Sequence, residues 1–288
     1  MTGVRDAVGR LTAASRPLSW INTAFPFGAA YLMSTREVDV RLVIGALFFL
    51  IPYNLLMYGI NDVFDYESDK NNPRKGGVEG ALLDERWHRL VLLASVTLPI
   101  PFVAYLVAAG SPLSWLVLAF SLFAVVAYSA PRLRFKERPV LDSLTSSTHF
   151  VSPALYGLVL AEQGIGRDVW LVLAAFFLWG AASQAFGAVQ DINADREGGI
   201  ASIATVLGAR ATVRLAMAAY AGAGLLLLLT PWRVAAVLVL PYLAILWPHR
   251  SVTDTASAVT NRGWRQFLGA NYAVGFLVTM MLIWAWRA

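Results

Sequence analysis

The stretch YGINDVFDYESD, from Tyr58 to Asp69, decides how this chain is interpreted. It follows an apolar run that begins near Leu42, so a membrane-embedded helix is predicted to end in a cluster of acids. Asp62, Asp65 and Asp69 are separated by three and four residues, a spacing that places the three carboxylates on one face of a helix. Like charges one turn apart repel each other, and burial near hydrocarbon adds a desolvation cost, so the cluster indicates a bound cation.

The chemistry of this cluster favours a hard metal ion. Its ligands are oxygens, and the chain contains no cysteine, which excludes disulfides and thiolate metal sites. Mg²⁺ prefers carboxylate oxygens, keeps part of its water shell and completes its coordination with substrate phosphate. Asn61, directly before the first Asp, is expected to orient a phosphate oxygen or a metal-bound water. The stretch therefore predicts a diphosphate-binding site at the membrane.

The composition is that of a membrane protein. The 288 residues are 58% hydrophobic and only 14% charged, and the mean hydropathy is +0.59, far from the values of soluble domains. A net charge of +5 could suggest nucleic acid as a partner. Membrane proteins, however, collect Lys and Arg on their cytoplasmic loops, so no nucleic-acid partner is expected. The first twenty residues lack the apolar core of a signal peptide, and no cleavage is expected.

Windows of about twenty apolar residues, the length that crosses a bilayer, follow one another along the chain. We predict an all-α polytopic membrane protein of nine transmembrane helices in a single domain, residues 1–288. The fifth window, with TSSTHFVSPALYG, is the most polar and is expected to be shielded from lipid by its neighbours. The predicted spans are 17–34, 41–61, 88–108, 112–130, 143–161, 168–190, 211–229, 232–248 and 266–286.

The distribution of charge predicts the orientation. With nine spans, most of the 23 Lys and Arg residues fall on the side that holds the N-terminus. The positive-inside rule then places the N-terminus in the cytoplasm and the C-terminus outside the cell membrane. Most acids lie on the same cytoplasmic side, concentrated in the first stretch and in QDINADREGG, residues 190–199, at the end of the sixth span. Asp191 and Asp195 are again one helical turn apart.

Two facing rows of carboxylates can hold two or more Mg²⁺ ions that bridge the oxygens of a diphosphate. Such a clamp neutralises a departing diphosphate by electrostatic and Lewis-acid catalysis. The reaction it suits is ionisation of an allylic diphosphate, which leaves a carbocation open to attack by a double bond or ring. Either row alone could be an ordinary juxtamembrane ion-pair network, but two rows on one side favour the metal site.

These motifs resemble the UbiA superfamily of intramembrane prenyltransferases. The N-D-x-x-D-x-x-x-D pattern from Asn61 to Asp69 is followed by D-x-x-x-D at Asp191 and Asp195. The resemblance covers nearly the whole chain and implies a nine-helix bundle of the UbiA type. It also implies an active site on the cytoplasmic side, under cap loops at about 62–87 and 191–210. A third feature, a Tyr-Ser pair followed by basic residues, departs from the commoner spacing; here it comprises Tyr128, Ser129, Arg132 and Arg134.

Within the superfamily, the stretch from Pro52 to Gly80 is similar to lycopene elongases of C50 carotenoid biosynthesis. That similarity implies dimethylallyl diphosphate as the donor and lycopene, an apolar isoprenoid embedded in the bilayer, as the acceptor. Transfer to a quinone precursor, haem, chlorophyllide or a glycerol-phosphate lipid remains open. So do a cation-coupled transporter and a non-catalytic subunit of a carotenoid-synthesising complex.

The resemblance and the residue types assign roles to the remaining candidates. The acids Asp62, Asp65, Asp69, Asp191 and Asp195 are expected to hold metal, with Asn61 beside them. Basic side chains near the motifs are expected to grip diphosphate oxygens and help exclude water, unless they are only positive-inside residues. They are Lys70, Arg74, Lys75, Arg132, Arg134 and Arg196.

Four residues are candidates for the cation and acceptor pocket. Tyr58 and Tyr128 could each set a ring against a developing cation, or could belong to the interfacial aromatic belt. Asn54 and Gln184 are polar residues inside predicted spans and are expected to face the interior of the bundle. His149 is the one candidate for a general base near a cavity.

Overall fold

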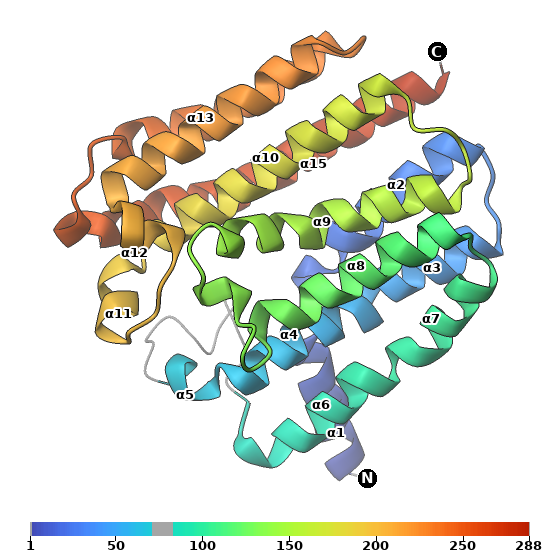
Figure 1. Cartoon of the computed structure of the whole chain (residues 1–288), viewed down its shortest axis with the longest axis horizontal. Coiled ribbons are helices and arrows are strands. Elements are labelled where there is room, and N and C mark those ends of the chain that lie inside the picture. Colours follow the sequence, from blue (N-terminus) through green and yellow to red (C-terminus); the bar gives the residue numbers. More distant parts are fainter. Residues whose placement is uncertain (1, 71–82, 288) are drawn as a thin grey trace. The chain divides into compact units, whose positions relative to one another are not determined.

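The computed structural model describes residues 2–70 and 83–287, and these residues form helices joined by short loops, without any strand (Figure 1). The side chains of residues 2, 68 and 69 are outside the description as well. The expected all-α class is therefore confirmed for the described chain.

Contacts divide the chain into two compact units. The first consists of Met1–Phe135 and Ser152–Gly164, and the second of Lys136–Val151 and Ile165–Ala288. Helix α9 (Leu141–Leu160) contributes its first half to the second unit and its last half to the first.

The first unit is built from helices that prolines divide into shorter pieces. The predicted span 41–61 is interrupted at Ile51, before Pro52, and the span 88–108 is interrupted at Leu98, before Pro99. Proline lacks the amide donor and collides with the preceding turn, so it favours a helix break at both positions. The helices are α1 (Thr2–Ala14), α2 (Ile21–Thr35), α3 (Val40–Leu50), α4 (Pro52–Phe64), α5 (Tyr66–Asp69), α6 (His88–Thr97), α7 (Pro99–Ala108) and α8 (Pro112–Ser129).

Aromatic side chains from α2, α3, α4 and α9 form the core of the first unit. The ring of Phe27 lies 5.1 Å from that of Phe49 and 6.0 Å from that of Tyr156, and all three side chains are buried. Gly45 is required where α3 crosses α2, because a Cβ there would collide with the Phe27 ring. This core holds the N-terminal end of α4 through Tyr53, and the C-terminal end of α4 carries the first acidic stretch.

The second unit packs α10 against α13, with α14 and α15 beside them. Its core centres on Tyr220 and Tyr242, whose rings stack at 5.0 Å, and it includes Trp179, 6.1 Å from the ring of Phe267. The helices of the unit are α10 (Arg167–Val189), α11 (Ile192–Glu197), α12 (Ile203–Leu207), α13 (Ala209–Leu228), α14 (Leu240–Leu246) and α15 (Asn261–Arg287). Short 3₁₀ helices cover Arg233–Val239 and Asp254–Thr260.

By length and composition, 6 helical stretches of the described chain are able to cross a membrane. They support a multi-pass membrane protein, while the number of nine spans stays a prediction. The predicted span 17–34 falls on α2, which has 15 residues, and the span 143–161 falls on the hydroxyl-rich α9. The six stretches are Val40–Phe64, Glu85–Ala108, Pro112–Ser129, Arg167–Val189, Ala209–Leu228 and Asp254–Arg287, with a shorter apolar stretch at Arg233–His249.

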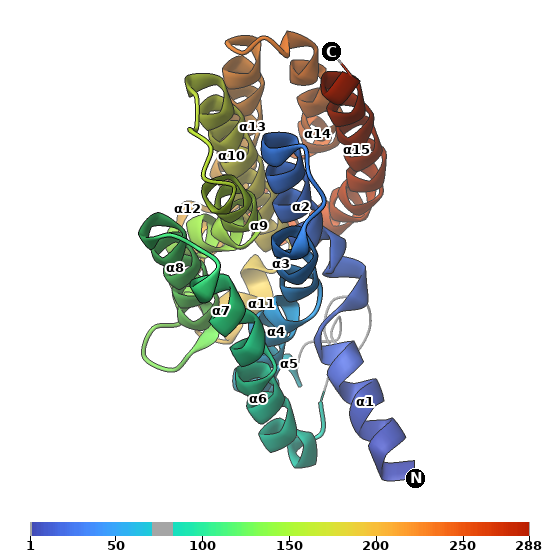
Figure 2. The same cartoon turned by 90° about the vertical axis from the view of Figure 1, so that its right-hand side faces the viewer.

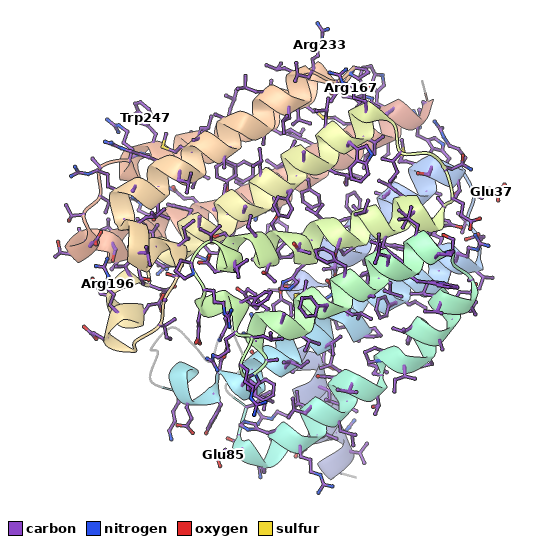
Figure 3. All side chains as sticks on the ribbon, in the orientation of Figure 1. Glu37, Glu85, Arg167, Arg196, Arg233 and Trp247 are labelled. Carbon is purple, nitrogen blue, oxygen red and sulfur yellow. The ribbon has the colours of Figure 1, made fainter. Side chains whose placement is uncertain are left out.

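Within each unit the acidic stretch lies at one end of the helices. Figure 3 shows Glu37 and Glu85 at opposite ends of the first unit, and α4 carries its acids toward the end marked by Glu85. In the second unit, Arg167 marks the start of α10 and Arg196 lies beyond its other end. Figure 2 shows α1 at the same end of the first unit as α5 and α6.

Candidate active site

Asp62, near the end of α4, is the most deeply buried of the acids described in the first stretch, with 1% of its surface exposed. Its Oδ1 accepts a hydrogen bond of 2.7 Å from Nη2 of Arg16, a residue 46 positions earlier in the chain. The Arg16 guanidinium also lies 4.2 Å from the centroid of the Tyr58 ring. The Arg16 guanidinium thus forms a charge-assisted hydrogen bond with the buried carboxylate and a cation–π contact with the Tyr58 ring.

The turn after α1 holds Arg16 in this position. Arg16 has a φ of 50°, in the left-handed region that residues other than glycine rarely adopt. The indole Nε1 of Trp20 donates to both the carbonyl and the hydroxyl of Ser15, at 3.0 Å each. Because nothing in the local spacing points from Arg16 to Asp62, the sequence alone did not identify this residue.

Asp65 is held between two helices. Asn61 donates through Nδ2 to Oδ2 of Asp65 and to Oγ of Ser129, at the end of α8, the latter at 2.9 Å. A guanidinium nitrogen of Arg134 lies 3.6 Å from Oδ1 of Asp65. Arg134, one of the candidate diphosphate-binding residues, therefore lies at the first acidic stretch. Ser129, which the sequence showed only as part of the Tyr-Ser motif, contacts the site as well.

The first stretch is not one uninterrupted helix. Helix α4 ends at Phe64, Asp65 occupies the junction with φ −101° and ψ −1°, and α5 begins at Tyr66. The side chain of Asp69, beyond this junction, lies outside the description, so the shared face of the three carboxylates stays a prediction.

The second stretch has the same construction. Helix α10 ends at Val189, and Asp191 caps α11 with φ −98° and ψ −4°. The amide of Asp195 donates to the carbonyl of Asp191 at 2.8 Å. Both side chains are half-buried.

Arg196 ties the second stretch to the rest of its unit. Its guanidinium lies 2.8 Å from Oδ2 of Asp254 and donates to the carbonyl of Thr205 at 2.7 Å. Asp254 also accepts the amide hydrogen of Ala209 at 2.7 Å. These contacts give Arg196 a role in holding the loop, beside the diphosphate contact that its position in the sequence suggested.

Asp142 fixes the loop that follows the second stretch, and the sequence did not reveal it. This acid is 1% exposed and accepts amide hydrogens from Ser143 and from Ile203, the first residue of α12, at 2.8 Å each. It precedes the predicted span 143–161, and burial raises the pKa of its carboxyl above the usual range, against the lowering effect of these hydrogen bonds.

The four pocket candidates have different surroundings. Asn54 is fully buried and donates through Nδ2 to Thr23 and to the carbonyls of Phe49 and Leu50, at 2.7, 2.8 and 3.1 Å. Helix α3 ends at Leu50, so its last carbonyls lack the amide donors of a continuing helix, and Asn54 stabilises the helix break.

The other three are less deeply buried. Tyr58 has one face covered by Arg16, and Tyr128 is half-buried at the end of α8. Gln184 accepts a hydrogen bond of 3.1 Å from Ser146, between α10 and α9 within the second unit. His149 is buried in α9.

The remaining basic candidates lie at the surface or outside the description. Lys70 is exposed, with Nζ 6.0 Å from the ring centroid of Tyr66, and Arg132 is exposed with a φ of 73°. Arg74 and Lys75 belong to residues 71–82, which the structure does not describe.

The donor set of the first stretch fits a hard divalent cation. Asp62 and Asp65 offer buried carboxylate oxygens beside an amide, and each already has a cationic group within 4 Å. Among the described side chains, no group of three or more His, Asp and Glu is close enough to hold a metal ion. Two carboxylates do not complete the coordination of a hard divalent cation, so substrate and water would supply further ligands.

Comparison with known proteins identifies relatives along nearly the whole chain. The UbiA prenyltransferase family profile matches residues 23–272. The lycopene elongase/hydratase of Corynebacterium glutamicum is 51% identical over 281 residues, which cover 96% of this chain and 98% of that protein. A C50 β-cyclic carotenoids biosynthesis protein of Dietzia sp. (strain CQ4) is 55% identical over 275 residues, 94% of this chain but only 64% of that relative's length.

Solved structures share the fold. A UbiA homolog from Archaeoglobus fulgidus bound to DMAPP and Mg²⁺ superposes with a TM-score of 0.65 at 18% sequence identity, over 92% of this chain and 98% of that one. At this identity the likeness shows the helical architecture only.

Proposed function

This chain belongs to the UbiA prenyltransferase family, and from that premise we propose that it adds dimethylallyl groups to lycopene in the membrane. The observation that carries the acceptor is the 51% identity, over nearly the full length of both chains, to a lycopene elongase/hydratase. The donor is supported by the DMAPP bound to the Archaeoglobus fulgidus homolog. Membership in a prenyltransferase family favours covalent transfer over cation-coupled transport.

Asp62, Asp65, Asp69, Asp191 and Asp195 hold two or more Mg²⁺ ions in this proposal. Their oxygens are the ligands that Mg²⁺ prefers, and Mg²⁺ is bound in the structural homolog. When bound, the metal neutralises the negative charge of the leaving diphosphate. Asn61 orients the site, since it holds Asp65 against Ser129.

The basic residues bind diphosphate oxygens and exclude water that would otherwise quench the cation. Arg134 is the best supported of them, because it lies 3.6 Å from an oxygen of Asp65. Lys70, Arg74, Lys75, Arg132 and Arg196 are assigned the same role on their positions in the sequence.

Tyr58, Tyr128 and Gln184 are assigned to the isoprenoid cation and the acceptor on their positions in the sequence. An alkene acceptor carries no hydroxyl to deprotonate, so no base is needed to activate it. The hydrogen bonds of Asn54 support a bracing role for that residue at the break between α3 and α4.

The decisive experiment expresses the gene in cells that accumulate lycopene and separates the extracted pigments by liquid chromatography and mass spectrometry. We expect products heavier by one and by two C5 units, and Asp62→Asn should return the profile to lycopene. Unchanged lycopene with the wild-type protein would exclude lycopene as the acceptor. Purified protein with Mg²⁺ and dimethylallyl diphosphate should stop turning over when a chelator is in excess.

The active site faces the cytoplasm in this proposal, with the N-terminus on the same side. The chain has no cysteine, so single introduced cysteines are labelled without background. Glu37→Cys and Glu85→Cys place exposed thiols at opposite ends of the first unit (Figure 3). In intact cells an impermeant maleimide should label the first and spare the second, and the reverse pattern would overturn the orientation.

Whether both acidic stretches share one set of ions is tested with a cysteine pair. Glu67→Cys on α5 and Glu197→Cys on α11 are exposed positions beside the two stretches. A short bis-maleimide should join them within one polypeptide, more efficiently with Mg²⁺ and diphosphate present. Two cysteines that label fully but never cross-link would refute the shared site.

A further inference from the structure

Arg16 occupies a carboxylate that the proposed function assigns to metal. Its Nη2 is 2.7 Å from Oδ1 of Asp62, the side chain of Asp62 is 0% exposed and that of Arg16 is 19% exposed. A buried carboxylate without a nearby cation is strongly destabilising. Arg16 therefore offsets the cost of burying the Asp62 charge, a cost that a bound metal ion would offset as well.

A divalent ion and a guanidinium compete for the same oxygen. If Mg²⁺ is coordinated by Asp62, the positive charge of Arg16 a few ångströms away is repelled. We propose that Arg16 is the resident counter-ion of Asp62, which neutralises this acid before metal binds and gives it up when the metal is bound. The proposal rests on the proposed function, because it needs Asp62 to be a metal ligand.

The surroundings of Arg16 are suited to such an exchange. The guanidinium is also supported by the Tyr58 ring at 4.2 Å, so it keeps one favourable contact after it leaves the carboxylate. The backbone at φ 50° is fixed by Pro17 on one side and by the Trp20 bonds to Ser15 on the other. A movement of the side chain alone is thus sufficient, and the charge stays at the site.

The consequence is that metal affinity depends on whether diphosphate is present. Without diphosphate, an incoming ion has to displace Arg16 and binds weakly. With diphosphate, the released guanidinium has anionic oxygens nearby, so its displacement costs less. The metal is then captured mainly together with the donor.

The competition is measured with Mn²⁺ as the probe, by electron paramagnetic resonance on purified protein in lipid nanodiscs. In the absence of diphosphate, Arg16→Gln should bind Mn²⁺ about tenfold more tightly than the wild type, because one charge-assisted hydrogen bond no longer competes. Arg16→Lys, which keeps the charge but loses the planar guanidinium, should lie between the two. Arg10→Gln, an exposed position on α1, should match the wild type.

The sign of the change separates this role from simple anchoring of α1. If Arg16 only stabilised the fold, its loss would loosen the site and weaken Mn²⁺ binding. The same variant should melt at a lower temperature than the wild type in chelator and gain more from added Mg²⁺. Equal or weaker Mn²⁺ binding by both Arg16 variants would overturn the proposal.

Two further arms keep the outcomes distinct. Inorganic pyrophosphate should tighten Mn²⁺ binding by the wild type more than by Arg16→Gln, and Asp62→Asn should remove the difference between them. A wild type that turns over in chelator and binds no Mn²⁺ would refute the metal-dependent function itself. Metal-dependent turnover with identical Mn²⁺ affinities would refute only the counter-ion.

Discussion

Asp65 and Asp191 occupy equivalent junctions in the two units of the chain. Each lies just after an apolar helix, α4 or α10, each has φ near −100° and ψ near 0°, and each directly precedes a short helix, α5 or α11. Each is also followed four residues later by a second acid, Asp69 or Asp195. Asp62 has no acidic counterpart in this alignment, because Ala188 precedes Asp191 at the same distance.

The junction acids are expected to be equally important for activity. Asp65→Asn and Asp191→Asn each remove one charged ligand, and we expect turnover to fall about a hundredfold or more in each. Initial rates with dimethylallyl diphosphate and lycopene in liposomes provide the measurement. Glu197→Gln, on the exposed side of α11, should leave the rate unchanged. Retention of full activity in Asp191→Asn would show that the second stretch binds no metal.

Ser129 should contribute through Asn61. Ser129→Ala removes the acceptor of the 2.9 Å hydrogen bond and leaves Asn61 bound to Asp65. The loss of one such bond lowers kcat/KM by about three- to tenfold. Asn61→Ala removes both contacts and should reduce kcat/KM further. If Ser129→Ala and Asn61→Ala reduce it equally, the contact of Asn61 with Asp65 has no separate effect.

The role of Arg196 can be determined by comparing variants of Arg196 with variants of its ion-pair partner Asp254. If its main role is to hold the loop, Arg196→Ala should lower the melting temperature slightly, because the pair is partly exposed, and Asp254→Ala should lower it more, because it also loses the Ala209 amide. The double variant should then add little to Asp254→Ala. If Arg196 binds diphosphate, Arg196→Ala should raise the KM for the donor about tenfold while Asp254→Ala does not. Donor titrations on the three variants distinguish these outcomes.

Asn54 is expected to affect stability rather than chemistry. Asn54→Leu leaves the Leu50 carbonyl at the α3–α4 break without a side-chain donor and the Phe49 carbonyl with Thr23 alone, and it should cost about 1–3 kcal/mol of unfolding free energy. Thermal unfolding in nanodiscs measures the loss, and Thr23→Val, which removes one acceptor of the same network, should show a smaller one. A normal melting temperature combined with a raised KM for lycopene would instead support the acceptor pocket.

The parts of this protein that the sequence predicted well depend on local patterns. Hydropathy identified a multi-pass helical chain, and acids spaced by three and four residues led to the family. The breaks inside two predicted spans were not predicted. Pro52 and Pro99 mark them, but the mean hydropathy of a window does not depend on whether a proline interrupts the helix.

The sequence by itself determined the helical class, the membrane location and the two acidic motifs, because hydrophobicity and helical spacing are properties of neighbouring residues. Only the tertiary structure decided which distant groups meet these motifs. Arg16 reaches Asp62 across 46 residues, and Ser129 reaches Asn61 across 68. The physical reason is that such pairs form when separate helices pack against each other. The residue pattern within one helix does not specify which residue of another helix will contact it.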